Sequence, residues 1–211
     1  MTTSTRPTNS RMAAVFNLPN QLTSLRLILS VVLFCFIGWE FYLISMVLFI
    51  IAASTDWLDG YYARKYGQVT TLGRILDPFA DKVIVCGTFI FLAAIPVMSE
   101  VPLGLRAWMV VVIVGRELLV TALRSFIEER GSDFSAQMSG KLKMVLQCVA
   151  AAAALFYLSY LDPDAADRFA LPEAPDWVRA TMVGSLWAAL VLTVYSGIGY
   201  IVIAVRLLRR S

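Results

Sequence analysis

Long apolar runs separated by polar segments dominate the chain from residue 22 to its end. A membrane-crossing helix needs about 20 mostly apolar residues, and six stretches come close to that length. These predicted helices are Leu22–Gly38, Phe41–Ala63, Pro78–Val97, Leu103–Phe126, Met138–Leu161 and Ala180–Leu208. Because the segments between them are mostly short, we expect an all-α polytopic membrane protein with six transmembrane helices in a single bundle.

The segment before the first apolar run is polar and basic. Residues 1–16 are predicted to be a cytoplasmic arm, and residues 17–211 a single membrane domain. The arm and the following run together resemble a signal peptide. No small-residue cleavage site follows, however, and five more apolar runs do, so we interpret this run as an uncleaved first span.

The basic residues are distributed unevenly between the two ends of the predicted helices. If the N-terminus is cytoplasmic, the outer connections are Trp39–Glu40, Met98–Pro102 and Asp162–Arg179. With Arg106 counted among them, these connections hold three of the 18 basic residues and seven acidic ones. Since cytoplasmic loops are the ones enriched in Lys and Arg, we expect both termini to be cytoplasmic. The acidic, proline-rich stretch Leu161–Asp176 is expected to be an outer loop without a catalytic role.

Composition supports the membrane assignment and removes several mechanisms. Apolar residues make up 59% of the 211 positions and charged residues 16%, against about 25% charged in soluble domains. Mean hydropathy is +0.72. There is no histidine, which excludes histidine-based triads and histidine metal sites. Three cysteines without a CxxC pair indicate neither a zinc site nor a disulfide framework. We expect a lipid bilayer as partner and no nucleic acid.

Four aspartates stand where the second and third apolar runs meet. Asp56 and Asp59 are three residues apart at the end of one predicted helix, and Asp77 and Asp81 are four apart at the start of the next. Each pair therefore lies on one helix face. Two antiparallel helices with a short connection would gather all four carboxylates at the cytoplasmic boundary.

Four neighbouring carboxylates need positive partners, because like charges raise one another's pKa. Carboxylate oxygens without histidine or cysteine favour hard ions such as Mg²⁺ or Mn²⁺, and a pair of ions suits phosphoryl transfer. Salt bridges to nearby Arg and Lys are the alternative. Asp77 before Pro78 also has a simpler interpretation, as a helix N-cap followed by proline in the first turn.

Gly60 and Arg64 extend the predicted site by one helical turn. A glycine beside a carboxylate pair lets a polar group approach the backbone closely, and an arginine binds phosphate through two hydrogen bonds. Close helix packing, which small residues serve in membranes, is the alternative for Gly60.

These residues form a pattern found in a known family. Asp56-x-x-Asp59-Gly60-x-x-Ala63-Arg64, followed by Gly73, Asp77 and Asp81, resembles the complete signature of the CDP-alcohol phosphatidyltransferases. The segment from Asn17 to Arg26 looks like the family's N-terminal segment. The segments 115–124 and 139–143 are similar to the phosphatidylglycerophosphate synthase branch, which often has threonine where this chain has Met144. The resemblance covers about residues 17–205.

The resemblance implies a homodimer with a cytoplasm-facing polar cavity and two metal ions, Mg²⁺ or Mn²⁺. By position, Asp56, Asp59 and Asp77 resemble the ligands of the first ion, and Asp56, Asp77 and Asp81 those of the second. Asp81 is also similar to the proposed general base. The expected contacts to CDP-diacylglycerol are Gly60, Arg64, Thr70, Asn20 and Thr23.

The resemblance also implies that the acceptor is sn-glycerol 3-phosphate and that the products are phosphatidylglycerophosphate and CMP. A phosphorylated acceptor requires a second anion pocket. Arg116 and Arg124, eight residues apart on one helix side, and Lys141 are the candidates for it. Glu117 is expected to pair with one of these three. Charges within a span mark functional sites, whereas positive-inside topology alone is the alternative for Arg124, Lys141 and Lys143.

Other functions remain open at this point. The signature fits the shared lipid donor and leaves the acceptor undecided, so phosphatidylglycerol, as in a cardiolipin synthase, or an inositol phosphate are alternatives. A small cation transporter could also use the carboxylates. Against that class, the carboxylates gather at one membrane face, whereas transporter sites lie near the midplane.

Overall fold

The computed structural model describes residues 18–66, 71–129, 138–161 and 174–208. Side chains are described for residues 24–54, 79–80, 82–125, 140, 142–161 and 174–206. Within these ranges every regular element is a helix, which confirms the all-α class. The elements are α2 (Leu18–Gly38), α3 (Tyr42–Tyr66), α4 (Thr71–Ala94), α5 (Pro96–Glu100), α6 (Ala107–Glu129), α7 (Met138–Leu161) and α9 (Asp176–Leu208).

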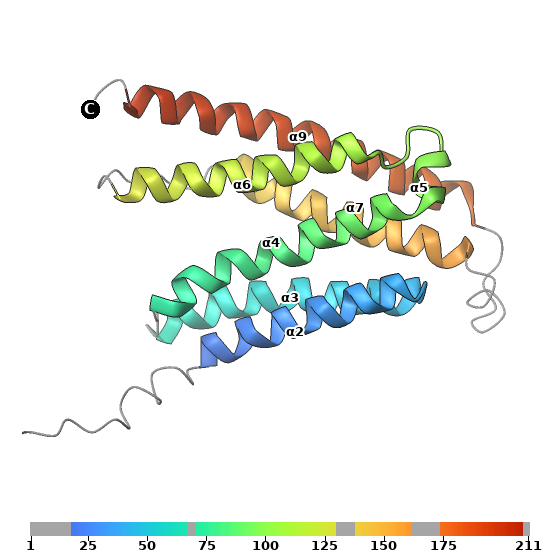
Figure 1. Ribbon diagram of the computed structural model, residues 1–211, viewed down its shortest axis with the longest axis horizontal. Coiled ribbons are helices and arrows are strands. Elements are labelled where there is room, and N and C mark those ends of the chain that lie inside the picture. Colours follow the sequence, from blue (N-terminus) through green and yellow to red (C-terminus); the bar gives the residue numbers. More distant parts are fainter. Residues whose placement is uncertain (1–17, 67–70, 130–137, 162–173, 209–211) are drawn as a thin grey trace, which may run out of the picture.

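The six longer helices run back and forth along one bundle axis (Figure 1). α2, α3 and α4 contact one another, and α7 packs against both α3 and α9. α6 lies beside α9 and α4. The start of α2, the end of α3, the start of α4 and the ends of α6 and α9 all lie at one end of the bundle (Figure 1). We call this the signature end, and the other the opposite end.

Two segments of the described helices are long and apolar enough to cross a membrane. They are Leu142–Leu161 in α7 and Asp176–Arg206 in α9. Shorter apolar segments occupy Ser24–Gly38, Tyr42–Ser54 and Lys82–Ala94. In α6 the apolar sequence is interrupted by charges at Arg116, Glu117 and Arg124. Six long helices are therefore present in the described chain, while six membrane spans remain a prediction.

The third predicted helix begins and ends at other residues than the apolar run suggested. α4 begins at Thr71, so Pro78 lies in the interior of the helix rather than in its first turn. The interpretation of Asp77 as an N-cap is therefore wrong. Proline has no N–H to donate to the carbonyl of residue 74. α4 ends at Ala94 because Pro96 follows and opens the short helix α5.

Close packing between α2 and α4 depends on one glycine. A Cβ atom at Gly87 would lie 2.2 Å from Cζ of Phe34, and the Phe34 ring stacks on Phe91 at a centroid distance of 5.0 Å. The missing side chain at residue 87 thus makes room for an aromatic ring from the neighbouring helix. This contact helps to hold α4 against α2 and hence fixes the helix that carries Asp77 and Asp81.

The opposite end is held together by aromatic side chains. The indole Nε1 of Trp187 in α9 donates to the backbone oxygen of Leu103, which precedes α6, at 3.0 Å. Trp187 also meets Trp108 edge to face. Leu103 has a positive φ of 62°, and its carbonyl accepts this hydrogen bond. The connection between α4 and α6 is therefore fastened to α9.

Candidate active site

The four aspartates of the signature lie on two consecutive helices. Asp56 and Asp59 belong to the last part of α3, and Asp77 and Asp81 to the first half of α4. Only residues 67–70 separate the two helices, which also contact each other. The backbone therefore brings both halves of the signature to one end of the bundle (Figure 1).

Several predicted site residues fall on side chains outside the described part of the chain. Thr70 lies outside the described residues altogether. The others belong to helices whose backbone is described while their side chains are not, namely Asn20, Thr23, Asp56, Asp59, Gly60, Arg64, Asp77, Asp81 and Lys141. Their metal-binding and donor-binding roles remain predictions. Among the described side chains, no group of three acidic or cysteine residues is arranged to hold a metal ion.

A cluster of buried charges joins α6 to α7. The Nζ atom of Lys143 in α7 forms a salt bridge with Oε1 of Glu117 in α6. Nη1 of Arg116 approaches the same oxygen at 3.4 Å. The three side chains are between 4% and 12% exposed. Two cations and one anion leave the cluster with a net positive charge, which favours an anionic ligand. We call Arg116, Glu117 and Lys143 the charge cluster.

Residues of α9 complete the surroundings of Arg116. Nη2 of Arg116 donates to Oγ of Ser196 at 2.9 Å, and its guanidinium carbon lies 5.3 Å from the centre of the Tyr200 ring. Nε of Arg116 is buried and has no hydrogen-bond partner within the described chain. One N–H group of this arginine therefore remains for a ligand or a water molecule.

The charge cluster faces α4 as well. The Cys86 thiol of α4 lies close enough to Glu117, Lys143 and Lys82 to interact with them electrostatically. Lys82 and Lys143 also interact in this way. Lys82 directly follows Asp81 in α4. The buried charges are therefore neighbours of the helix segment that carries the second half of the signature.

Sequence reasoning located part of this cluster. The predicted pairing of Glu117 is confirmed with Arg116, but its shorter salt bridge is to Lys143, which was not among the expected partners. Arg124 lies two turns further along α6, about 12 Å along the helix axis, and its buried Nε has no partner in the described residues. The binding of the acceptor's phosphate by Arg124 and Lys141 stays a prediction.

The contribution of α9 was missed because its residues lie inside an unbroken apolar run. A signal was nevertheless present in the sequence. Thr193, Ser196 and Tyr200 follow one another at spacings of three and four residues, which places them on one helix face. Thr193 accepts a hydrogen bond from Nε2 of Gln147 in α7 at 3.1 Å, so this polar face of α9 contacts both neighbouring helices.

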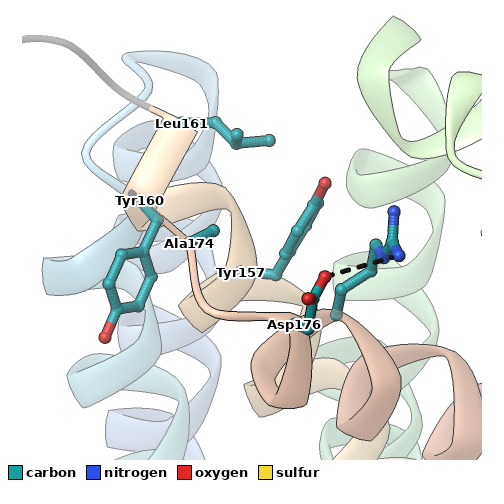
Figure 2. A pocket seen from close by; sticks show the side chains of 6 residues that line it. Tyr157, Tyr160, Leu161, Ala174 and Asp176 are labelled. Carbon is teal, nitrogen blue, oxygen red and sulfur yellow. Dashed lines mark ion pairs between the residues drawn. The ribbon is translucent and has the colours of Figure 1, made fainter. Parts of the chain in front are cut away.

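A separate cavity of about 320 Å³ opens at the opposite end of the bundle (Figure 2). It is lined by Tyr157, Tyr160 and Leu161 of α7 and by Ala174, Asp176 and Arg179. Asp176 and Arg179 form an exposed ion pair at 3.5 Å. Exposed pairs of this kind contribute little to stability. The cavity is remote from the signature, and none of the predicted site residues lines it.

Comparison with known proteins identifies the signature. The CDP-alcohol phosphatidyltransferase family profile matches residues 16–205. The chain belongs to this family. A protein from Bacillus subtilis (strain 168), named CDP-diacylglycerol–glycerol-3-phosphate 3-phosphatidyltransferase, is 37% identical over 158 residues, which cover 68% of this chain and 78% of the relative.

Other relatives carry the same name. The proteins of Salmonella choleraesuis (strain SC-B67) and Escherichia coli (strain K12) are 32% and 31% identical over 196 residues. These matches cover 88% of this chain and 93% of each relative. The phosphatidyltransferase match therefore extends well beyond the signature, to the helices that carry the charge cluster and its α9 contacts.

Proposed function

We infer that this protein transfers the phosphatidyl group of CDP-diacylglycerol to sn-glycerol 3-phosphate. The products are phosphatidylglycerophosphate and CMP. One observation carries the proposal: the complete signature lies on the joined ends of α3 and α4 in a chain that is 31–37% identical to relatives named for this reaction.

The donor set of the signature fits divalent cations. Four carboxylates are carried by two helices that contact each other and are joined by four residues, and hard oxygen ligands are those that Mg²⁺ and Mn²⁺ prefer. Asp56, Asp59 and Asp77 would hold one ion, and Asp56, Asp77 and Asp81 a second. When bound, such ions neutralise the diphosphate of the donor and the charge on departing CMP.

The protein's own residues bind the substrates and move one proton. Asp81 accepts the proton of the acceptor's 1-hydroxyl, whose oxygen forms a bond to the lipid-linked phosphorus. The bond between that phosphorus and the oxygen of CMP breaks, and CMP leaves with the electron pair. Gly60, Arg64, Thr70, Asn20 and Thr23 bind the nucleotide part of the donor.

Arg116 belongs to the acceptor's phosphate site in this proposal. Its guanidinium is almost fully buried, keeps one N–H group unpartnered and lies in a cluster with net positive charge. Lys143, buried beside it, adds to the attraction for an anion. We assign Arg124 and Lys141 to the same phosphate site, because both belong to the parts of α6 and α7 near the signature end.

The enzyme works in the cytoplasmic membrane with both termini and the active site on the cytoplasmic side. Two apolar segments of membrane-crossing length and the excess of basic residues near the signature end support this proposal. Six helices span the bilayer, and the protein acts as a homodimer.

The test is release of CMP by the purified protein from CDP-diacylglycerol in Mg²⁺. Glycerol 3-phosphate, phosphatidylglycerol, an inositol phosphate and no acceptor are compared. We expect CMP release with glycerol 3-phosphate and with none of the other additions. Release only with another acceptor would refute the assigned substrate, and the absence of release with every acceptor would refute the enzymatic function. Removal of divalent ions with EDTA should abolish the reaction, and added Mg²⁺ or Mn²⁺ should restore it.

A further inference from the structure

The guanidinium of Arg116 is held from α9 by two side chains one helical turn apart. Oγ of Ser196 accepts a hydrogen bond from Nη2 at 2.9 Å, and the ring of Tyr200 lies 5.3 Å from Cζ. Residues i and i+4 share a helix face. The two contacts hold the planar group in different ways, since the serine binds its edge and the aromatic ring attracts its charge.

Both contacts come from groups with fixed orientation. The Ser196 hydroxyl donates its single hydrogen to the backbone oxygen of Thr193 at 3.2 Å, so its lone pairs are left to accept from Arg116. Tyr200 is 2% exposed and packs against Val120 and Ala204 in a small apolar cluster. Neither group can turn away without breaking another contact.

Two glycines make room for the side chains of Arg116 and Tyr200. A Cβ atom at Gly197 would lie 3.0 Å from Cγ of Arg116, and one at Gly140 would lie 3.1 Å from the Tyr200 hydroxyl oxygen. Both distances are shorter than ordinary van der Waals contact. The side chain of Arg116 therefore passes directly over the α9 backbone between its two contacts.

We propose that Ser196, Gly197 and Tyr200 form a seat in α9 that positions Arg116 for the phosphate of the acceptor. The seat fixes the guanidinium so that its buried, unpartnered Nε remains available to the anion. Ser196 and Tyr200 are positioning residues in this proposal and touch no substrate. The inference rests on the proposed role of Arg116, and it adds α9 to the helices that determine acceptor affinity.

The first test compares two serines of α9. Ser196→Ala removes the acceptor of the Arg116 hydrogen bond, whereas Ser185→Ala is its matched control, because Ser185 also donates to a backbone oxygen three residues earlier. A hydrogen bond to a charged group corresponds to a change in affinity of about 10-fold or more. We expect Ser196→Ala to raise the KM for glycerol 3-phosphate by about 10-fold and the KM for CDP-diacylglycerol by less than about 2-fold.

The second test uses the aromatic ring. Tyr200→Leu should raise the acceptor KM by a factor similar to that of Ser196→Ala, and Tyr200→Phe should cause a much smaller rise because it keeps the ring. In an Arg116→Ala background neither Ser196→Ala nor Tyr200→Leu should raise the acceptor KM further. Thermal unfolding in detergent, followed for every variant, separates these effects from a loss of fold.

The outcomes distinguish the seat from the proposed function. If Arg116→Ala raises the acceptor KM while Ser196→Ala and Tyr200→Leu do not, the seat is refuted and the phosphate site stands. If Arg116→Ala leaves the acceptor KM unchanged, the phosphate site fails and the seat fails with it. Equal rises in both KM values, or additive effects in the Arg116→Ala background, would also overturn the seat.

Discussion

At the scale of single residues, the buried pair of Glu117 and Lys143 shows how this bundle tolerates charge. Each ion alone would be expensive inside an apolar helix interface. Glu117 accepts from Lys143 and, at 3.4 Å, from Arg116, so one carboxylate partly neutralises two cations. The pair thus ties α6 to α7, and together with Arg116 it leaves a net positive charge beside α4.

Breaking this pair from one side should destabilise the protein. Among the described side chains, Lys143→Met leaves Glu117 with the longer salt bridge to Arg116. Removal of one partner from a buried pair costs about 3–5 kcal/mol. The double variant Lys143→Met with Glu117→Gln should lose markedly less unfolding free energy than Lys143→Met. The unfolding free energies of the two single variants and the double variant are measured in mixed micelles. A double variant whose loss equals the sum of the two single losses would contradict the coupling.

The proposed base makes a second prediction at this scale. Asp81→Asn keeps the size of the side chain and removes its ability to accept a proton, and general-base catalysis contributes about 10²–10⁴ in rate. We expect CMP release to fall by at least about 100-fold while the unfolding temperature is retained. Asp176→Asn at the exposed opposite end is the control. Activity that survives in Asp81→Asn would remove Asp81 as the base.

At the scale of elements, the contact of α2 with α4 determines how the second half of the signature is held. Gly87 lets the Phe34 ring approach α4, and the ring is further fixed by stacking on Phe91. Because α4 extends from Thr71 to Ala94 as one helix, a shift near Gly87 would be transmitted along it toward Asp81.

Filling this contact should therefore weaken the bundle. Gly87→Ala forces its Cβ to within 2.2 Å of Phe34, and overpacking of this kind costs about 1–3 kcal/mol. Gly184→Ala, where no atom lies within 4 Å, should be neutral or slightly stabilising. Combining Gly87→Ala with Phe34→Leu should recover part of the loss. The measurement is the unfolding temperature of each variant in detergent. Equal changes in unfolding temperature for Gly87→Ala and Gly184→Ala would argue against the packing role of Gly87.

The elements could be predicted well from the sequence, and the side-chain contacts between them only in part. Apolar runs located all six long helices, but polar residues and Pro78 concealed the true start of α4 at Thr71. Identifying Lys143 rather than Lys141 as the partner of Glu117 requires knowing which face of α7 points toward α6. Residues two apart point in different directions on a helix. Ser196 and Tyr200 contact a residue about 80 positions earlier, which only packing reveals.

At the scale of the whole molecule, the buried charge cluster and the Trp187 contact lie in different parts of the bundle. The buried charges and the signature lie toward one end, and the fastening of Trp187 to Leu103 lies at the other. In the proposed orientation the signature end faces the cytoplasm and the opposite end faces the outside of the cell. The assignment of sides follows from the basic residues and leads to a direct test.

Labelling of single cysteines tests that orientation. In a variant lacking Cys35, Cys86 and Cys148, Glu40→Cys and Glu100→Cys should react with a membrane-impermeant maleimide in intact cells. Ser211→Cys should react only after the membrane is opened. The reverse pattern would invert the proposed topology. Reaction of Ser211→Cys together with either of the other two in intact cells would require an even number of spans between them, and would exclude the five or three spans that the six-helix topology places there.

The distribution of tryptophan has an optical consequence. Four of the five tryptophans lie at the opposite end: Trp108, Trp177 and Trp187 belong to α6 and α9, and Trp39 lies between α2 and α3. Trp187 and Trp108 are in contact there. Trp57 alone is part of the signature segment of α3. Intrinsic fluorescence of the intact protein therefore reports chiefly on packing at the opposite end, and a variant that keeps only Trp57 would be a spectroscopic probe of events at the signature end.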